Sequence, residues 1–129
     1  MSVEICVLDD SHIKRFEEQK AWLHGMWEKD LEAQGVKWPG GPVAISWLVG
    51  LSFFLERPVD KNSLGLFANK IAGGSTDAQA RHLRSKYGWY IVSDGRGPPE
   101  YRRLVNGTHM PKGTYALASL RPEPNLCAR

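Results

Sequence analysis

Residues 75–84, Ser-Thr-Asp-Ala-Gln-Ala-Arg-His-Leu-Arg, begin the stretch 75–119 that decides the fold. Mostly apolar or small side chains recur there at the spacing by which a helix buries one face, namely Thr76, Ala80, Leu83 and Tyr87. The opposite face carries Ala78, Arg81 and Ser85, with Asp77, His82 and Arg84 on its flanks. Because this face is small at its centre and basic around it, the pattern predicts a helix that can enter a nucleic-acid groove. Thr76 or Asp77 is expected to cap its amino end.

Two strands are expected after this helix, because residues 89–92 and 114–118 show the period-2 alternation of strands with one buried face. Trp89 opens the first strand and is expected to pack beneath the helix. Asp94-Gly95 is a hairpin-turn dipeptide, and Pro98-Pro99 cannot continue a ladder in the interior of a sheet. The sequence therefore predicts a long exposed loop between the strands, with arginines that contact phosphates, namely Arg96, Arg102 and Arg103.

Three runs of sequence, residues 80–84, 87–91 and 112–117, resemble the winged helix-turn-helix DNA-binding domain. They are similar in particular to the versions attached to HNH-type restriction endonucleases and to those in small phage proteins. The resemblance covers roughly residues 43–120 and implies an α+β fold, with a three-helix core and a β-hairpin wing. The loop of this chain is longer than a minimal wing, and no nuclease domain accompanies it.

Two further helices are expected before the basic helix. Residues 43–55 are nearly apolar throughout and predict a buried helix, although Gly50 weakens it by about 1 kcal/mol relative to alanine. A second helix is predicted with Asn62 or Ser63 as its cap, because apolar side chains repeat at helical spacing at Leu64, Phe67, Ala68 and Ile71. Residues 72–75, Ala-Gly-Gly-Ser, are expected to form the turn between helices, since glycine allows a tight reversal.

The amino-terminal third predicts an additional amphipathic helix. Residues 3–8 are a candidate strand, and residues 9–11 supply helix-capping side chains. The helix is expected from His12 to Gln34, with an apolar stripe formed by Ile13, Phe16, Leu23, Trp27 and Leu31. Two partners for this stripe stay open. The helix either folds back on the rest of the chain or packs on a copy of itself, in a homodimer that reads two half-sites.

Residues 38–42, Trp-Pro-Gly-Gly-Pro, are the clearest break in the chain. We therefore expect an amino-terminal extension over 1–42, a winged-helix domain over 43–121 and a tail over 122–129. The extension holds five Lys and Arg against eight Asp and Glu, a net charge of −3, and the remainder carries +6. Positive charge concentrated beside the basic helix and hairpin favours a nucleic-acid partner.

The composition suits a folded globular chain, with 42% hydrophobic and 24% charged residues in 129. The acidic amino terminus does not have the pattern of a secretory signal, and the longest apolar stretch is shorter than the about 20 residues of a membrane span. We therefore expect a cytoplasmic protein with no membrane partner. Cys6 and Cys127 are expected as reduced thiols, with a disulfide between the two termini as the alternative.

No catalytic, metal-binding or cofactor-binding group is expected. The histidines are scattered and form no ligand pair with a cysteine or carboxylate, at His12, His24, His82 and His109. Residues 73–75, Gly-Gly-Ser, precede a helix as in a phosphate cradle, but no P-loop lysine follows in frame. The sequence thus predicts a binding protein that is not an enzyme.

The resulting hypothesis is a small regulator or recognition module for double-stranded DNA, selective for sequence or for base modification. The residues expected in the major groove are Gln79, Arg81, His82, Arg84 and Ser85, and those expected on the backbone are Arg96, Arg102, Arg103 and Lys112. Tyr90 and Tyr101 either stack on bases or are structural. The alternative function is a winged-helix module that binds or inhibits a host or partner protein.

Overall fold

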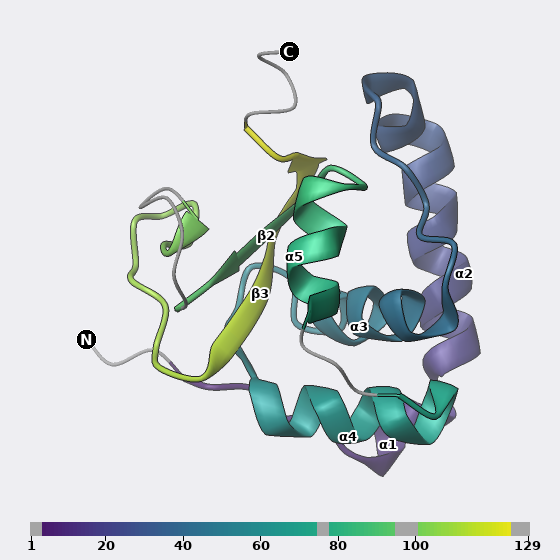
Figure 1. Ribbon diagram of the computed structural model, residues 1–129, viewed down its shortest axis with the longest axis vertical. Coiled ribbons are helices and arrows are strands. Elements are labelled where there is room, and N and C mark those ends of the chain that lie inside the picture. The colour runs from purple at the N-terminus through teal and green to yellow at the C-terminus, as the bar shows by residue number, and fades with distance from the viewer. Residues whose placement is uncertain (1–3, 75–77, 95–100, 125–129) are drawn as a thin grey trace.

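The computed structural model describes residues 4–74, 78–94 and 101–124 (Figure 1). These residues form an α+β fold, as predicted, with five α-helices and a three-stranded antiparallel sheet. The elements in chain order are α1 (Asp10–Lys14), α2 (Phe16–Met26), the π-helical turn η1 (Trp27–Leu31), the 3-10 turn η2 (Glu32–Gln34), α3 (Pro42–Ser52), β1 (Val59–Asp60), α4 (Lys61–Ala72), α5 (Ala78–Ser85), β2 (Trp89–Ser93) and β3 (Thr114–Pro122). None of the helices in these ranges has the length and apolar character that a membrane span requires.

The sheet has β3 at its centre, between β1 and β2, and both pairings are antiparallel. Val59 of β1 pairs with Tyr115, and Ile91 of β2 pairs with Leu117. Because side chains alternate along a strand, Leu117 packs with the helices whereas Ala116 packs on the opposite side. The sheet therefore has a helix face, covered by helices, and a loop face.

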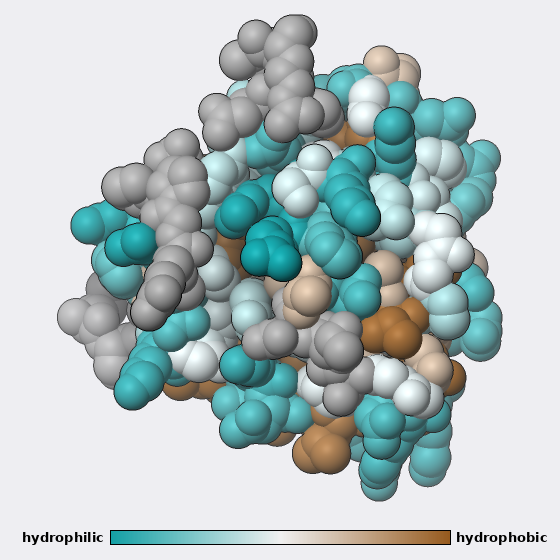
Figure 2. All heavy atoms as spheres, viewed as in Figure 1, coloured by the Kyte–Doolittle hydropathy of each residue, from teal (hydrophilic) through white to brown (hydrophobic). Residues whose placement is uncertain are grey.

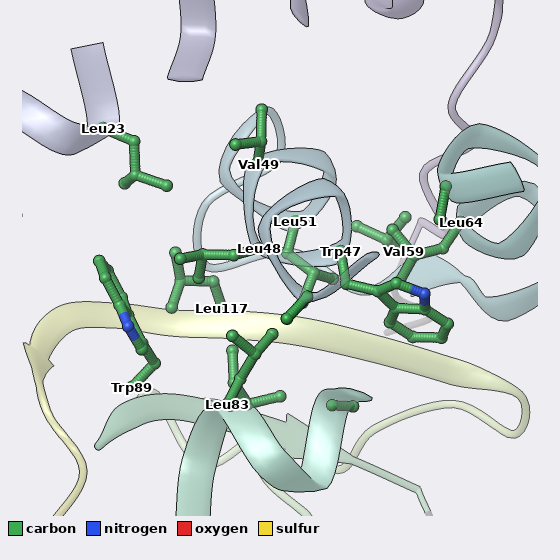
Figure 3. Close-up of a cluster of buried hydrophobic side chains, with 14 of the residues drawn as sticks. Leu23, Trp47, Leu48, Val49, Leu51, Val59, Leu64, Leu83, Trp89 and Leu117 are labelled. Atoms are coloured by element: carbon green, nitrogen blue, oxygen red, sulfur yellow. The ribbon is translucent and has the colours of Figure 1, made fainter. Parts of the chain in front are cut away.

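The main core lies on the helix face and is organised around α3. Eight of the 11 residues of this helix are buried, namely Ala44, Ser46, Trp47, Leu48, Val49, Gly50, Leu51 and Ser52. Figure 3 shows Leu48 and Leu51 gathered with Leu83 of α5 and Leu117 of β3. The predicted buried helix is thus present, and neighbours cover it on several sides.

Gly50 allows α4 to pack closely on α3. A Cβ atom at this position would lie 2.8 Å from Leu64 Cδ1 and 3.1 Å from Leu8 Cδ1. The residue that weakens the isolated helix therefore makes room for its neighbours.

The start of α4 differs from the expectation. Its N-cap is Asp60, whose carboxylate accepts a hydrogen bond from the Ser63 amide at 2.9 Å, so neither Asn62 nor Ser63 is the cap. Asp60 also belongs to β1, a two-residue strand. The helix ends at Gly73, whose φ of 73° lies in the left-handed region that glycine adopts without strain.

The amino-terminal helix predicted from His12 to Gln34 is interrupted. Asp9 caps α1, the chain leaves helical geometry at Arg15, and α2 continues into η1 and η2 before Gly35 ends the helical region. The candidate strand at 3–8 contributes, within its described part, a single parallel bridge from Cys6 to Val59.

The predicted apolar stripe packs within the chain. Phe16, Leu23 and Leu31 are buried in the main core, and Gln19 Nε2 donates to Ser52 of α3. Trp27 Nε1 donates to the carbonyl of Val36, 2.8 Å away. In Figure 1, α2 stands beside α3. Of the two partners considered for this helix, the chain itself covers the stripe, and a homodimer stays a prediction.

Candidate nucleic-acid interface

The basic helix is α5, which buries one side and leaves the other open. Ala80 and Leu83 are 4% and 0% exposed and belong to the main core, as the spacing predicts. The expected caps Thr76 and Asp77 lie outside the described residues. Figure 2 shows hydrophilic side chains gathered over α5 on the face turned to the viewer.

The predicted groove residues do not all share one environment. Arg81 and Ser85 are exposed, whereas Gln79, His82 and Arg84 are half-buried. The Ser85 hydroxyl donates to the carbonyl of Arg81 at 2.8 Å, so its proton is engaged with the helix backbone. Arg81 is therefore the cation of α5 that projects furthest toward solvent.

Arg84 is engaged with the protein. Its guanidinium carbon lies 4.3 Å from the centroid of the Tyr101 ring, within cation–π range. Tyr101 is 4% exposed and also meets the Tyr90 ring edge to face, at 6.5 Å between centroids. This contact joins α5 to the segment that follows β2.

Residues 101–113, here called the return loop, are exposed only in part, whereas the sequence predicts an exposed loop. Tyr101, Leu104 and Met110 are buried. Leu104 and Met110 pack with residues on the loop face of the sheet, namely Val92, Ala116 and Ala118. The described part of the loop thus folds back and covers this face, because its apolar side chains would otherwise stay in water.

Backbone hydrogen bonds give the return loop a shape of its own. The Leu104 amide donates to the Thr108 carbonyl at 2.8 Å, and the Met110 amide donates to the Arg102 carbonyl at 2.9 Å. At the base, the Gly113 amide donates to the Asp94 carboxylate at 2.8 Å.

The predicted backbone contacts differ in exposure. Lys112 and Arg103 are exposed, and Arg103 Nη1 donates to the Gly107 carbonyl at 3.2 Å. Arg102 is half-buried, and its Nε is enclosed without a hydrogen-bond partner among the described residues. Arg96 lies outside the described residues. Exposure therefore favours Arg103 and Lys112 over Arg102 as contacts for a ligand.

Glu123 is a buried acidic residue that the sequence did not single out. It is 4% exposed, accepts a hydrogen bond from the Tyr101 hydroxyl, and its amide donates to the Gly88 carbonyl at 2.9 Å. The described end of the predicted tail consequently packs on the fold. A charged residue between Pro122 and Pro124 carries no sequence signal for burial.

In the described ranges, no three His, Cys, Asp or Glu residues lie together as a possible metal site. His12 Nδ1 accepts from the Asp9 amide, and His24 pairs with Glu28. Burial raises the pKa of the Cys6 thiol, with Arg57 opposing the shift, so burial keeps this free cysteine protonated. Cys127 lies outside the described residues.

Comparison with known proteins gives no match, either to a family model, to a curated protein or to a solved structure. The candidate interface therefore depends on the residues and geometry of this chain alone.

Proposed function

We propose that this protein is a winged helix-turn-helix module that binds double-stranded DNA. In this interpretation α3, α4 and α5 are the three-helix core, and β2 and β3 are the strands of the wing. The order of helix, short strand, two helices and hairpin supports it, as does the placement of β3 between β1 and β2. Gly73 ends α4, and the next described helix is α5, the proposed recognition helix.

One observation carries the proposal. The helix α5 buries Ala80 and Leu83 while Arg81 stays exposed, in the part of the chain that holds the excess of positive charge. Because α5 is anchored by its buried side chains and presents a basic side chain on its exposed face, it has the shape and charge that docking in the major groove requires.

The exposed cations have separate roles in this proposal. Arg81 donates paired hydrogen bonds to guanine in the major groove and therefore contributes to sequence preference. Arg103 and Lys112 contact phosphates and contribute affinity that depends little on sequence and strongly on salt. Gln79 and His82 lie on the same helix and supply further groove contacts.

The test begins with selection of a preferred duplex from random DNA, followed by titrations with the selected and a random duplex. Arg81→Ala should weaken binding to the selected duplex by about 1–3 kcal/mol and reduce the preference. Arg103→Ala should weaken both duplexes alike and reduce the salt dependence by about one phosphate contact. Lys29→Ala removes an exposed cation from η1 and is the matched control, with no expected effect.

Two results would contradict the proposal. Equal losses on both duplexes for Arg81→Ala and Arg103→Ala would remove the division of roles. Absence of any duplex binding, together with a stable complex with a protein, would support an interaction module instead.

A further inference from the structure

We propose that Arg84 is a positioning residue, which holds the return loop at a fixed place relative to α5 through the ring of Tyr101. The proposal rests on the proposed function for its consequence in DNA binding, but the contact itself exists without DNA. It assigns Arg84 a different role from Arg81, although both are cations on the same short helix.

The Tyr101 side chain is the point where three parts of the chain meet. Arg84 of α5 lies over its ring at 4.3 Å, and Tyr90 of β2 meets the ring at its edge. The hydroxyl donates a hydrogen bond to Glu123. The Glu123 amide in turn donates to the carbonyl of Gly88, between α5 and β2. Ring and hydroxyl are thus held by separate partners, so Tyr101 has little freedom to shift.

Arginine suits this position better than lysine. The guanidinium is planar and weakly hydrated, so it stacks on an aromatic ring, whereas an ammonium is a compact and strongly hydrated charge. Because Tyr101 is 4% exposed, the contact is shielded from water on the side of the ring, which strengthens it. Arg81 provides the comparison, since its guanidinium has no such ring contact among the described residues and is exposed.

Tyr101 is also the first described residue of the return loop, and the loop carries Arg103 and Lys112. An anchor at this point sets where these two cations lie relative to Arg81. If the anchor is lost, the phosphate contacts and the groove contact no longer fit one duplex at the same time, and affinity falls for every sequence.

Amide hydrogen exchange without DNA tests the anchor itself. The probes are the amides of Leu104 and Met110, which are hydrogen-bonded within the return loop, and the reference is the Glu56 amide, which donates to the Leu117 carbonyl in the main fold. Arg84→Ala and Arg84→Lys should both speed exchange at the two loop amides by about tenfold. The Glu56 amide should be unchanged, and Arg81→Ala should leave all three as in the wild type.

Tyr101→Phe separates the two halves of the contact, because it keeps the ring under Arg84 and removes the hydroxyl bound to Glu123. Tyr101→Phe should speed exchange of the loop amides. The further acceleration caused by Arg84→Lys should be the same in the Tyr101→Phe background as in the wild type. Unchanged loop exchange in Arg84→Ala would overturn the proposal. Faster exchange at the Glu56 amide in step with the loop would overturn it as well, since Arg84 would then stabilise the whole fold.

DNA titration is the second arm. Arg84→Lys keeps the positive charge. If this variant bound DNA with wild-type affinity, Arg84 would act as a phosphate contact, and its positioning role would be overturned. We expect instead that Arg84→Lys and Arg84→Ala lose affinity alike, on selected and random duplexes. If no duplex binds the wild type, the DNA-binding function fails, while the exchange experiment still decides whether Arg84 anchors the loop.

Discussion

The two faces of the sheet are covered in different ways. On the helix face, large side chains from four helices and all three strands form one core that includes Leu83 and Leu117. On the loop face, Leu104 and Met110 pack on smaller partners such as Ala116 and Ala118. Along β3 the side chains alternate between these two environments, large toward the helices and small toward the loop.

This difference separates stability from ligand placement. Burial of apolar area on the helix face supplies most of the stabilisation, since that face encloses many more large side chains. The loop face encloses a smaller set of apolar side chains, which holds the return loop in place. An exposed cation on that loop, such as Lys112, can therefore be changed with little risk to the fold.

The largest expected effect is on the free energy of unfolding, when a leucine is replaced by alanine on each face of the sheet. Leu83→Ala leaves a cavity at a fully enclosed site and should lower the free energy of unfolding by about 3–5 kcal/mol. Leu104→Ala, at a site 6% exposed in the smaller cluster, should cost about 2 kcal/mol. Urea denaturation measures both, and equal losses would mean that the faces do not differ in this way.

A pair of glycines tests how tightly the helix face is packed. Gly50→Ala would press a methyl group against Leu64 and should destabilise the fold by about 1–2 kcal/mol, despite the better helix propensity. Gly25→Ala, in α2, meets no atom within 4 Å and should stabilise it by about 0.5–1 kcal/mol. The opposite signs are the diagnostic result, and the same denaturation series gives both values.

The loop side has its own closing contact at Asp94. Asp94→Ala removes the acceptor of the Gly113 amide and should cost about 1 kcal/mol. Exchange at the Met110 amide should rise while the Glu56 amide stays as in the wild type. Equal acceleration at both amides would show that the loop and the main core open together.

The smallest expected effect is the pH dependence from Asp9, which caps α1 far from the loop. The Ser11 hydroxyl, and then the amides and the His12 side chain, lower the Asp9 pKa from its ordinary 3.8. A lowered pKa in the folded state stabilises above the unfolded value, and the contribution is lost as pH falls through the folded value. The stability difference between wild type and Asp9→Asn should thus shrink below pH 3.8, and a difference independent of pH would contradict this assignment.

The sequence predicted the helices best where burial follows a regular spacing. The apolar run at 43–55 and the repeat at Ala80 and Leu83 depend on neighbours one helical turn away, so they are visible in a linear pattern. The amino-terminal segment was predicted as one helix from His12 to Gln34, whereas the structure divides it at Arg15. Its apolar stripe continues across the break at Arg15, so periodicity alone did not reveal the interruption.

The return loop was predicted to be exposed, and this is correct for Arg103 and Lys112 but not for its apolar side chains, whose burial depends on distant partners. Tyr101, Leu104 and Met110 have no strand or helix period, and the sheet face that they cover is formed by residues before and after them in the chain. The contact between Arg84 and Tyr101 has the same origin. Basic composition indicated which cations to consider, whereas only the fold distinguishes an exposed Arg81 from a stacked Arg84.

The aromatic side chains beside α2 provide a natural optical probe of the amino-terminal segment. Trp38 lies 5.8 Å from Trp27 and 6.1 Å from Trp89, measured between ring centroids. The Trp38 ring therefore lies between the indole of Trp27 in η1 and that of Trp89 in β2. Detachment of residues 10–34 would move the Trp27 ring away from Trp38 and admit water around both rings. The intrinsic fluorescence spectrum would then report that event directly, with no added label.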